Sequence, residues 1–290
     1  MRNSIVSLLM AAAISASGQD LLAELEKQAP SEPTFVSSTF KSTRLVNGQT
    51  VETKGKGALE FIFAHRFGPI SSGAYELYGL DQAYVRLGLE YGITDQLGVG
   101  IGRNSEDKTM DAYVRYKFLR QQDGGMPVTV TAFGIAGYKF SPRDEDATYD
   151  IQPVDRLSYV GQLLIARKFS TALSLQLMPS IVHKNAVVAA IENNNMAAIG
   201  FGGRLKVTKS VALTTEYYYR IGVPDANPYY NPLGFGIDIE TGGHVFQLVM
   251  TNSRGLTERA FLTETNGDFF AGDISFGFNV TRTFQLSKQK

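Results

Sequence analysis

The chain has 290 residues, 28 of them basic and 28 acidic, so its formal net charge is zero. Without a basic excess it has little means to replace the counterions of nucleic acid, which argues against nucleic acid as a partner. The absence of cysteine excludes a disulfide framework and a lipid-anchored cysteine. The 29 glycines exceed the usual share of about 7%, and together with 14 Tyr and 18 Phe they are typical of an exported β-barrel.

The first 18 residues predict a secretory signal peptide. Arg2 supplies a positive charge, residues 5–16 form an apolar core, and residues 16–18 are small enough for cleavage. The apolar core is too short to cross a bilayer as a helix. The alternative to a signal peptide is that these residues form the first helix of a cytosolic domain. No later segment has about 18 consecutive apolar residues, so we expect no transmembrane helix. We therefore predict export, with a mature chain that starts near Gln19.

Residues 19–55 form an N-terminal segment that we expect to lie in the periplasm. Residues 20–29 predict a short polar helix that ends at two prolines. Residues 34–55 are rich in Thr, Ser and Lys, and the pair Asn47-Gly48 predicts a turn. Since this stretch lacks a clean apolar face, we place it outside the barrel wall and treat it as a candidate plug of the lumen.

From residue 56 onward, bulky apolar residues alternate with small or charged ones, which predicts strands with one apolar and one polar face. The alternation is clearest in YVRLGLEYGITDQLGVGIGR, residues 84–103, which predicts a two-stranded hairpin. Twelve strands are predicted, at about 56–66, 82–92, 95–103, 108–120, 127–140, 155–168, 172–183, 197–207, 210–222, 232–240, 244–251 and 273–285. The faces of the strand at 127–140 are ambiguous.

The direction of the apolar faces separates a soluble barrel from a membrane barrel. In a soluble barrel the apolar faces of all twelve strands would have to fill one interior, whereas side chains fill the interior of a barrel of only about eight strands. With the apolar faces turned to lipid, the charged faces line the lumen and no filling is needed. We therefore predict an all-β fold, a transmembrane antiparallel up-and-down β-barrel of about 12 strands over residues 56–286, in the bacterial outer membrane.

The loops alternate in length, as they do in outer-membrane barrels with short periplasmic turns and long external loops. Short turns are expected at 93–95, 169–171, 208–210 and 241–243, and longer loops at 67–81, 141–154, 184–196, 223–231 and 252–272. With the short turns in the periplasm, the first strand runs outward and the last runs inward. This parity requires that 232–240 is a strand and that 34–55 is not part of the wall.

Aromatic residues stand where interface girdles are expected in a membrane barrel. They are Phe67, Tyr91, Tyr138, Phe140, Phe169 and Phe284. The last strand ends in Phe284-Gln285-Leu286, which resembles the aromatic C-terminal signal that the barrel-assembly machinery reads. We therefore expect that machinery as a partner during biogenesis, outer-membrane lipid as the surroundings of the wall, and residues 20–55 as a candidate binding site for a periplasmic partner.

Five blocks combine barrel alternation with distinctive loop sequences. They are ALEFIFAHRFG (58–68), SGAYELYGLDQA (72–83), LGLEYGITDQLGVGIGR (87–103), FQLVMTNSRGLTERAFLTET (246–265) and GDISFGFNVTRTF (272–284). These blocks resemble a domain-of-unknown-function family of outer-membrane β-barrel proteins from Bacteroidota-type bacteria, over residues of about 45–285. The resemblance implies the fold and the location, and it carries no substrate or catalytic residues.

The three histidines, His65, His183 and His244, share the lipid-directed face of their strands. A Ser-His pair on the wall, as in outer-membrane phospholipase, would make the chain a lipid esterase. The alternative is interfacial histidines with polar tips at the level of the lipid headgroups. Since G-x-S-x-G, H-E-x-x-H and P-loop patterns do not occur, we predict that the protein is not an enzyme and expect no catalytic residues, no cofactor and no metal.

Charged residues on the polar faces of the strands are the stronger site candidates. The lumen-lining candidates are Glu60, Arg66, Arg86, Glu90, Asp111, Arg115, Lys117, Arg204, Lys206, Glu216, Arg220, Asp238 and Glu240. They either line a pore with rings of charge that select permeants, or pair with one another and hold the barrel shut. The sequence leaves both alternatives open, and the near balance of signs predicts weak ion selectivity if a pore exists.

The longest external loop, residues 252–272, is the second candidate for constricting the lumen. Its residues 256–264 are compatible with a helical turn, and its phenylalanines favour packing over exposure to water. The constriction-loop candidates are Arg254, Glu258, Arg259 and Phe261.

Three functions remain open at this level. The first is a narrow channel for small polar solutes, the second a closed structural, adhesive or assembly barrel without transport, and the third, more remote, an outer-membrane lipid esterase.

Overall fold

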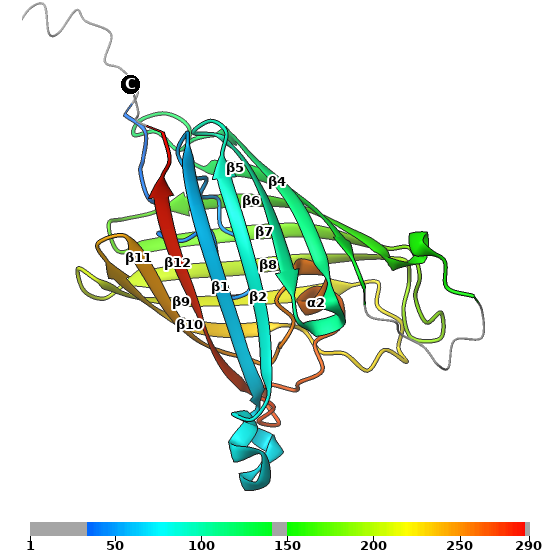
Figure 1. Ribbon diagram of the computed structural model, residues 1–290. Helices are drawn as coiled ribbons and strands as arrows, with labels where there is room; N and C mark the ends of the chain where they lie inside the picture. Colours follow the sequence, from blue (N-terminus) through cyan, green and yellow to red (C-terminus); the bar gives the residue numbers. More distant parts are fainter. Residues whose placement is uncertain (1–33, 141–149, 288–290) are drawn as a thin grey trace, which may run out of the picture. The chain divides into compact units, whose positions relative to one another are not determined.

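Residues 34–140 and 150–287 are described by a computed structural model, and they form a closed antiparallel β-barrel of twelve strands (Figure 1). The strands are β1 (Ala58–Pro69), β2 (Ala83–Gly92), β3 (Leu97–Asn104), β4 (Met110–Leu119), β5 (Thr129–Tyr138), β6 (Leu157–Lys168), β7 (Leu173–Lys184), β8 (Asn195–Lys206), β9 (Val211–Ile221), β10 (Leu233–Thr241), β11 (His244–Thr251) and β12 (Ser275–Gln285). Each strand pairs with its neighbours in the chain, and β1 pairs with β12 to close the barrel. The predicted fold and all twelve predicted strands are confirmed, with ends that differ by a few residues.

The described parts of the loops contain five short helices, four of them of the 3-10 type. These are η1 (Ile70–Ser72), η2 (Ala74–Gly79), η3 (Glu106–Lys108), η4 (Pro153–Arg156) and α2 (Glu258–Thr263). Within the described ranges, none of the helices has the length and apolar character that crossing a membrane requires. The predicted signal peptide and the predicted helix at 20–29 lie outside the described residues.

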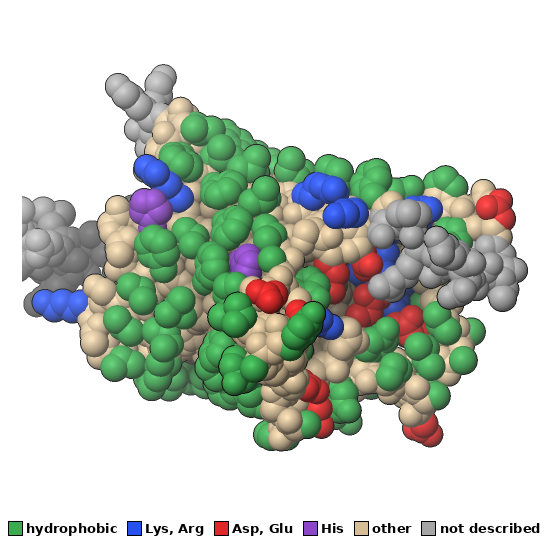
Figure 2. Space-filling view, turned by 60° about the horizontal axis from the view of Figure 1, so that its bottom comes forward, with side chains coloured by type: hydrophobic (Ala, Val, Ile, Leu, Met, Phe, Trp, Pro, Cys, Tyr) green, Lys and Arg blue, Asp and Glu red, His purple; other side chains and the backbone are tan. Residues whose placement is uncertain are grey.

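The two faces of each strand differ as the alternation predicts. On β9, Leu213 and Tyr219 point outward and are exposed, whereas Glu216 and Tyr218 between them are buried inside the barrel. Hydrophobic side chains therefore cover most of the outer wall (Figure 2). An apolar outer wall is the surface that lipid tails solvate, so the strands carry their apolar faces toward the membrane.

β5 is the strand whose faces the sequence leaves ambiguous, and its side chains explain why. Its inward residues include bulky Phe133 and Ile135, which are buried. The outward residues around them, Ala132, Gly134 and Ala136, are small. In the middle of β5 the bulky apolar residues thus face the lumen and the small ones face outward, the reverse of the other strands. The alternation alone therefore does not show which face of this strand points to the lipid.

The start of the first strand, β1, and the end of the last strand, β12, lie at the end of the barrel that carries the short turns. Ala58 at the start of β1 pairs with Gln285 at the end of β12, and the N–H of Gly57 donates to the carbonyl of Gly92, where β2 ends (2.8 Å). β10 is a true wall strand, paired on both sides. The parity required by the loop lengths is therefore met.

A charge on the outer wall tests the direction of the apolar faces. Ile101 points outward from the middle of β3 and is exposed. Ile101→Arg should lower the free energy of unfolding from lipid vesicles by about 2–4 kcal/mol, because arginine near the bilayer midplane is costly. Ile101→Ala is the matched control for loss of the side chain. Equal unfolding free energies for the two variants, measured by urea titration, would contradict a lipid-facing wall.

Candidate functional site

The lumen of the barrel is occupied by the chain itself. Residues 39–51, called here the lumen hairpin, fold into the barrel from the end that carries the short turns, and nearly all of them are buried. The N–H of Thr50 donates to the carbonyl of Thr43, and the N–H of Leu45 donates to the carbonyl of Gly48, both over 2.9 Å. The predicted turn at Asn47-Gly48 is therefore present, as the tip of the hairpin.

A single carboxylate of the wall binds the tip of the lumen hairpin. The oxygens of Glu216 on β9 accept hydrogen bonds from the N–H groups of Val46 (3.1 Å), Asn47 (2.7 Å) and Gly48 (3.0 Å). Successive N–H groups in a tight turn point in one direction and form a concave binding site for an anion. Glu216 is fully surrounded by protein, and these three donors replace the water that its charge would otherwise require.

Polar side chains of β1, β11 and β12 bind the carbonyls of the same tip. Arg66 donates to the carbonyl of Val46 (3.0 Å) and to the side-chain oxygen of Asn47 (2.8 Å). Asn279 donates to the carbonyl of Val46 (3.0 Å), and Gln247 donates to the carbonyl of Leu45 (3.0 Å). The tip is therefore bound to the wall through its backbone N–H groups and through its backbone carbonyls.

The arm of the hairpin that returns toward the short turns is bound in the same way. The side-chain amide of Gln176 accepts from the N–H of Val51 (2.9 Å) and donates to the carbonyl of Gln49 (2.7 Å). Thr131 donates to the carbonyl of Val51 (2.8 Å), and Arg115 donates to the side-chain oxygen of Gln49 (2.5 Å). Strands β4, β5 and β7 thus hold this arm.

Helix α2 reaches the lumen hairpin from the opposite end of the barrel. Its six residues belong to the loop between β11 and β12 and are all buried (Figure 1). Glu258 accepts from Arg44 (2.9 Å) and from Gln49 (2.6 Å) of the hairpin, and the ring of Phe261 lies 5.2 Å from that of Tyr218 on β9. The two segments meet inside the barrel and close the lumen from both sides.

One side of the lumen is apolar. Phe40, Leu45 and Val51 of the hairpin and Phe261 and Leu262 of α2 belong to a buried cluster. The wall contributes Tyr113, Phe133, Ile135, Val160, Leu164, Ala166, Met178, Val182, Ala198 and Tyr218. These residues lie on β4 to β9, so the apolar side faces the polar side formed mainly by β1, β2 and β10 to β12.

The glycines of β3 allow charged side chains of β2 and β4 to meet across that strand. Arg86 and Asp111 form an ion pair of 2.5 Å, and a Cβ on Gly102 would come within 2.2 Å of the Arg86 guanidinium. Arg115 and Glu90 pair over 3.0 Å above Gly98. The inward glycines of LGVGIGR are therefore the space in which these pairs form.

The remaining lumen-lining candidates are paired or lie near the ends of their strands. Glu60 binds Lys54 (2.6 Å) and Thr43 (2.8 Å), and Lys117 binds Glu52 (3.5 Å). Five candidates remain. Arg204 pairs with both Asp238 and Glu240, Arg220 donates to Asn227 and to the carbonyl of Tyr229, and Lys206 is half-buried at the end of β8. Most of these charges are therefore paired with one another or bound to the hairpin.

A cluster of charges anchors α2 where the long loops lie. This mouth cluster consists of Asp107, Lys139, Lys184, Arg259 and Glu264. Arg259 pairs with Asp107 (3.2 Å) and Glu264 (2.5 Å), Lys139 pairs with Asp107 (2.9 Å), and Lys184 pairs with Glu264 (3.6 Å). Figure 2 shows acidic and basic side chains gathered in a hollow at this end of the barrel. The cluster ties α2 to η3, to the end of β5 and to the end of β7.

The charges of the mouth cluster set the pKa values of its members. Burial alone would raise the pKa of Glu264, but Arg259, Lys139 and Lys184 hold it below its ordinary value of 4.5. Burial and the repulsion of Arg259 lower the pKa of Lys139. Burial and the neighbouring Asp107 raise the pKa of Glu106 beside the cluster. Glu264 therefore stays ionised and binds α2 at neutral pH.

The other candidates lie at the rim or on the outer wall. Arg254 donates to the hydroxyl of Tyr84 on β2 (2.8 Å). The ring of His65 stacks on Phe278 (5.1 Å), that of His183 on Tyr159 (6.3 Å) and that of His244 on Phe246 (5.9 Å). These contacts place the histidines among outward-facing aromatic residues.

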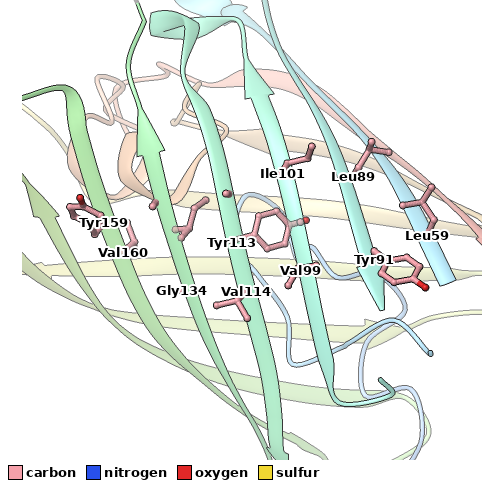
Figure 3. Close-up of a pocket in the computed structure, with 14 residues that line it drawn as sticks. Leu59, Leu89, Tyr91, Val99, Ile101, Tyr113, Val114, Gly134, Tyr159 and Val160 are labelled. Atoms are coloured by element: carbon pink, nitrogen blue, oxygen red, sulfur yellow. The ribbon is translucent and has the colours of Figure 1, made fainter. Parts of the chain in front are cut away.

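A large hollow lies on the outer wall. It has a volume of about 800 Å³ and is lined by residues that include Leu89, Val99, Ile101, Gly134 and Tyr159 (Figure 3). The small outward residues of β5 create it between the bulkier side chains of β2, β3 and β6. Two hollows at the long-loop end, beside Arg220 and beside Arg259, have volumes of about 20 and 10 Å³. Each has room for about one water molecule, so neither is a passage for a solute.

Sequence reasoning missed the uncharged residues that bind the hairpin. Gln176, Gln247 and Asn279 on the wall, and Asn47 and Gln49 in the hairpin, make most of these contacts. Their position on the polar face of a strand was the available signal for the wall residues. Charge on the polar faces of the strands therefore identifies only part of the site.

A closed twelve-stranded barrel with an apolar outer wall and charged residues inside is a membrane β-barrel. Residues 40–284 match the family described as membrane bound beta barrel domain (DUF5777), and the chain belongs to this family. The resemblance stated from the sequence is thereby confirmed. A comparison with curated proteins found no match.

Solved structures of outer-membrane channels are similar in fold. The COG4313 outer membrane channel from Pseudomonas putida F1 is 12% identical, with a TM-score of 0.50, 81% of this chain covered and 98% of that chain. The KdgM porin in complex with disordered oligogalacturonate is 10% identical, with a TM-score of 0.48 and coverage of 78% and 99%. The outer membrane protein Omp33 of Acinetobacter baumannii is 10% identical, with a TM-score of 0.41 and coverage of 79% and 99%. At these identities the likeness concerns the fold alone.

Removal of the Glu216 carboxylate should release the tip of the lumen hairpin. Glu216→Ala leaves three buried N–H groups without an acceptor, at a cost of roughly 1–3 kcal/mol for each. We expect hydrogen exchange of the amides of residues 46–48 to become at least about tenfold faster. Leu213→Ala on the outward face of the same strand is the control and should leave this exchange unchanged. Unaltered exchange in Glu216→Ala would contradict the assigned contacts.

Acidification should loosen α2. Because the folded pKa of Glu264 is lowered, its contribution to stability is present above pH 4.5 and is lost as the pH falls through the folded value. Glu106, with a raised pKa, acts in the opposite sense and contributes below pH 4.5. The protection factors of the α2 amides, which compare the observed exchange rate with the intrinsic rate at the same pH, should therefore fall below pH 4.5 in the wild type when the loss of the Glu264 contacts outweighs the opposite effect of Glu106. In Glu264→Gln the amides should exchange faster already at pH 7 and depend less on pH, and a profile identical to the wild type would contradict the mouth cluster as an anchor.

Proposed function

We propose that this membrane barrel is a narrow channel for small polar solutes, closed at rest by the lumen hairpin and α2. The observation that carries the proposal is what fills the closed lumen and how it is attached to the wall. Its contents are two loop segments that enter from opposite ends and are attached to the wall by side-chain hydrogen bonds and ion pairs. Loops of this kind constrict the lumen of porins.

The wall retains internal pairs that do not depend on the hairpin. Arg86 with Asp111 and Arg115 with Glu90 are pairs between wall strands. Movement of the hairpin therefore leaves these charges neutralised, which limits the electrostatic cost of opening. Since acidic and basic residues are nearly balanced, the open lumen should select weakly between cations and anions.

A closed barrel without transport is the second candidate, and one observation favours it. All residues of the lumen hairpin except Lys41 are buried, and its backbone is hydrogen-bonded throughout its tip. Such dense attachment also fits a barrel whose contents are permanent and whose loops bind other proteins. The two candidates differ in whether the hairpin leaves the lumen. Lipid hydrolysis stays the most remote candidate, because the histidines contact aromatic rings of the outer wall.

The family and fold support an outer-membrane location. In this proposal the signal peptide directs export, the barrel-assembly machinery inserts the chain through the pattern Phe284-Gln285-Leu286, and outer-membrane lipid surrounds the wall. The short turns face the periplasm, which puts residues 20–55 within reach of a periplasmic partner.

A disulfide lock tests the channel. A Cβ on Gly234 of β10 lies 3.4 Å from the Cβ of Val46, close to the separation of about 3.5–4.5 Å in disulfides, and the chain has no other cysteine. In planar bilayers, Val46→Cys/Gly234→Cys should show no conductance steps when oxidised and wild-type steps after reduction. Variants lacking 39–51 or 256–264 should show larger steps than the wild type.

The single variant Val46→Cys is the control and should not respond to oxidation. Equal steps in the oxidised and reduced double variant would show that ions cross the barrel without movement of the hairpin. That result would contradict closure of the channel by the hairpin. Stable insertion without steps in every variant, including both deletions, would overturn the channel and favour the closed barrel.

A further inference from the structure

The wall of the lumen binds the backbone of the lumen hairpin more than its side chains. Donors on the wall bind successive carbonyls of the hairpin, and acceptors bind its N–H groups. The donors to carbonyls are Gln247 to Arg44 and Leu45, Arg66 and Asn279 to Val46, Gln176 to Gln49, Arg115 to Thr50 and Glu52, and Thr131 to Val51. The acceptors are Glu216 for residues 46–48 and Gln176 for Val51.

These wall groups come from seven strands around the barrel. They are β1, β4, β5, β7, β9, β11 and β12. Each of these side chains is buried, with an exposed fraction of 5% or less. Gln176 is the most informative of them, because its amide both accepts from one residue of the hairpin and donates to another two positions away. A neighbouring β-strand offers the same pairing to a peptide.

We propose that the lumen is a binding site for short peptides and that the lumen hairpin is its intramolecular ligand. This inference rests on the proposed channel, since it names the class of solute that the channel takes when the hairpin withdraws. The groups that now bind the hairpin then become available to a solute of the same chemistry. The hairpin and the solute compete for one site, so the hairpin also sets the affinity that a solute must exceed.

The arrangement of the lumen favours peptides over sugars and simple ions. The apolar side of the lumen receives the side chains of Leu45 and Val51, among Phe133, Met178 and Tyr218. An inorganic ion has no group that would use such a surface, and a sugar offers it only the C–H faces of its rings, whereas a peptide with apolar side chains buries more apolar area there. Charged groups of the wall complement the backbone, Glu216 against the N–H groups and Arg66 against the carbonyls. A short peptide places an ammonium group and a carboxylate at its two ends, which match these charges.

The test uses the barrel without its own ligand. The variant lacking residues 39–51 is compared with a full-length variant in which residues 42–51 are replaced by glycine and serine, so that a folding defect of the deletion does not decide the result. The probe is the synthetic peptide STRLVNGQTV, the sequence of residues 42–51, and a scrambled peptide of the same composition is its control. Binding is measured by fluorescence anisotropy in detergent, and block of conductance is measured in planar bilayers.

We expect the native peptide to bind and block both variants at least tenfold more tightly than the scrambled peptide. Glu216→Gln in the same backgrounds should weaken binding about tenfold, whereas Leu213→Ala on the outward face should leave it unchanged. In vesicle-swelling assays, the tripeptide Leu-Asn-Gly should enter several times faster than a disaccharide of similar mass.

The outcomes separate this inference from the proposed channel. Conductance with equal binding of the native and scrambled peptides, and solute rates that follow size alone, would overturn the peptide site and leave the channel standing. Selective binding of the native peptide without conductance would support the peptide site and overturn the channel.

Discussion

The width of a twelve-stranded barrel is the constraint on which the rest of this structure depends. About eight strands enclose a space that the side chains of the wall fill, and twelve enclose more. This chain fills the additional space with its own residues 39–51 and with α2. The wall needs charged and amide side chains on its inner face because those segments bring backbone groups that must be hydrogen-bonded once they leave water.

Polar and apolar side chains of the wall divide this task. Polar side chains such as Glu216 and Arg66 bind the backbone of the hairpin, and the apolar cluster receives Leu45 and Val51. Apolar contacts contribute without regard to direction, whereas the hydrogen bonds fix the register of the hairpin. The closing segments enter from opposite ends and meet at Arg44 and Glu258. Displacement of either segment, from either side of the membrane, therefore disturbs the same closed state.

Much of the fold could be predicted from the sequence, because the alternation of strands has a single physical cause, lipid outside and polar groups inside. The faces of the strand at 129–138 could not be assigned from the sequence, since its bulky residues Phe133 and Ile135 face inward. The charged residues of the lumen could be selected from the same alternation. Their partners could not, because Glu216 and Val46 are 170 residues apart and only the closed barrel brings them together.

Labelling of single cysteines shows directly whether residues 39–51 lie inside the barrel. The native chain has no cysteine, so Val51→Cys reports on the hairpin alone. Tyr75→Cys, at a side chain that is 93% exposed, is the external reference. In membrane vesicles, a membrane-impermeant thiol reagent should label Tyr75→Cys rapidly and Val51→Cys at least about a hundredfold more slowly from either side, as expected for a group that is reached only by opening. Rapid labelling of Val51→Cys from either side would contradict the account.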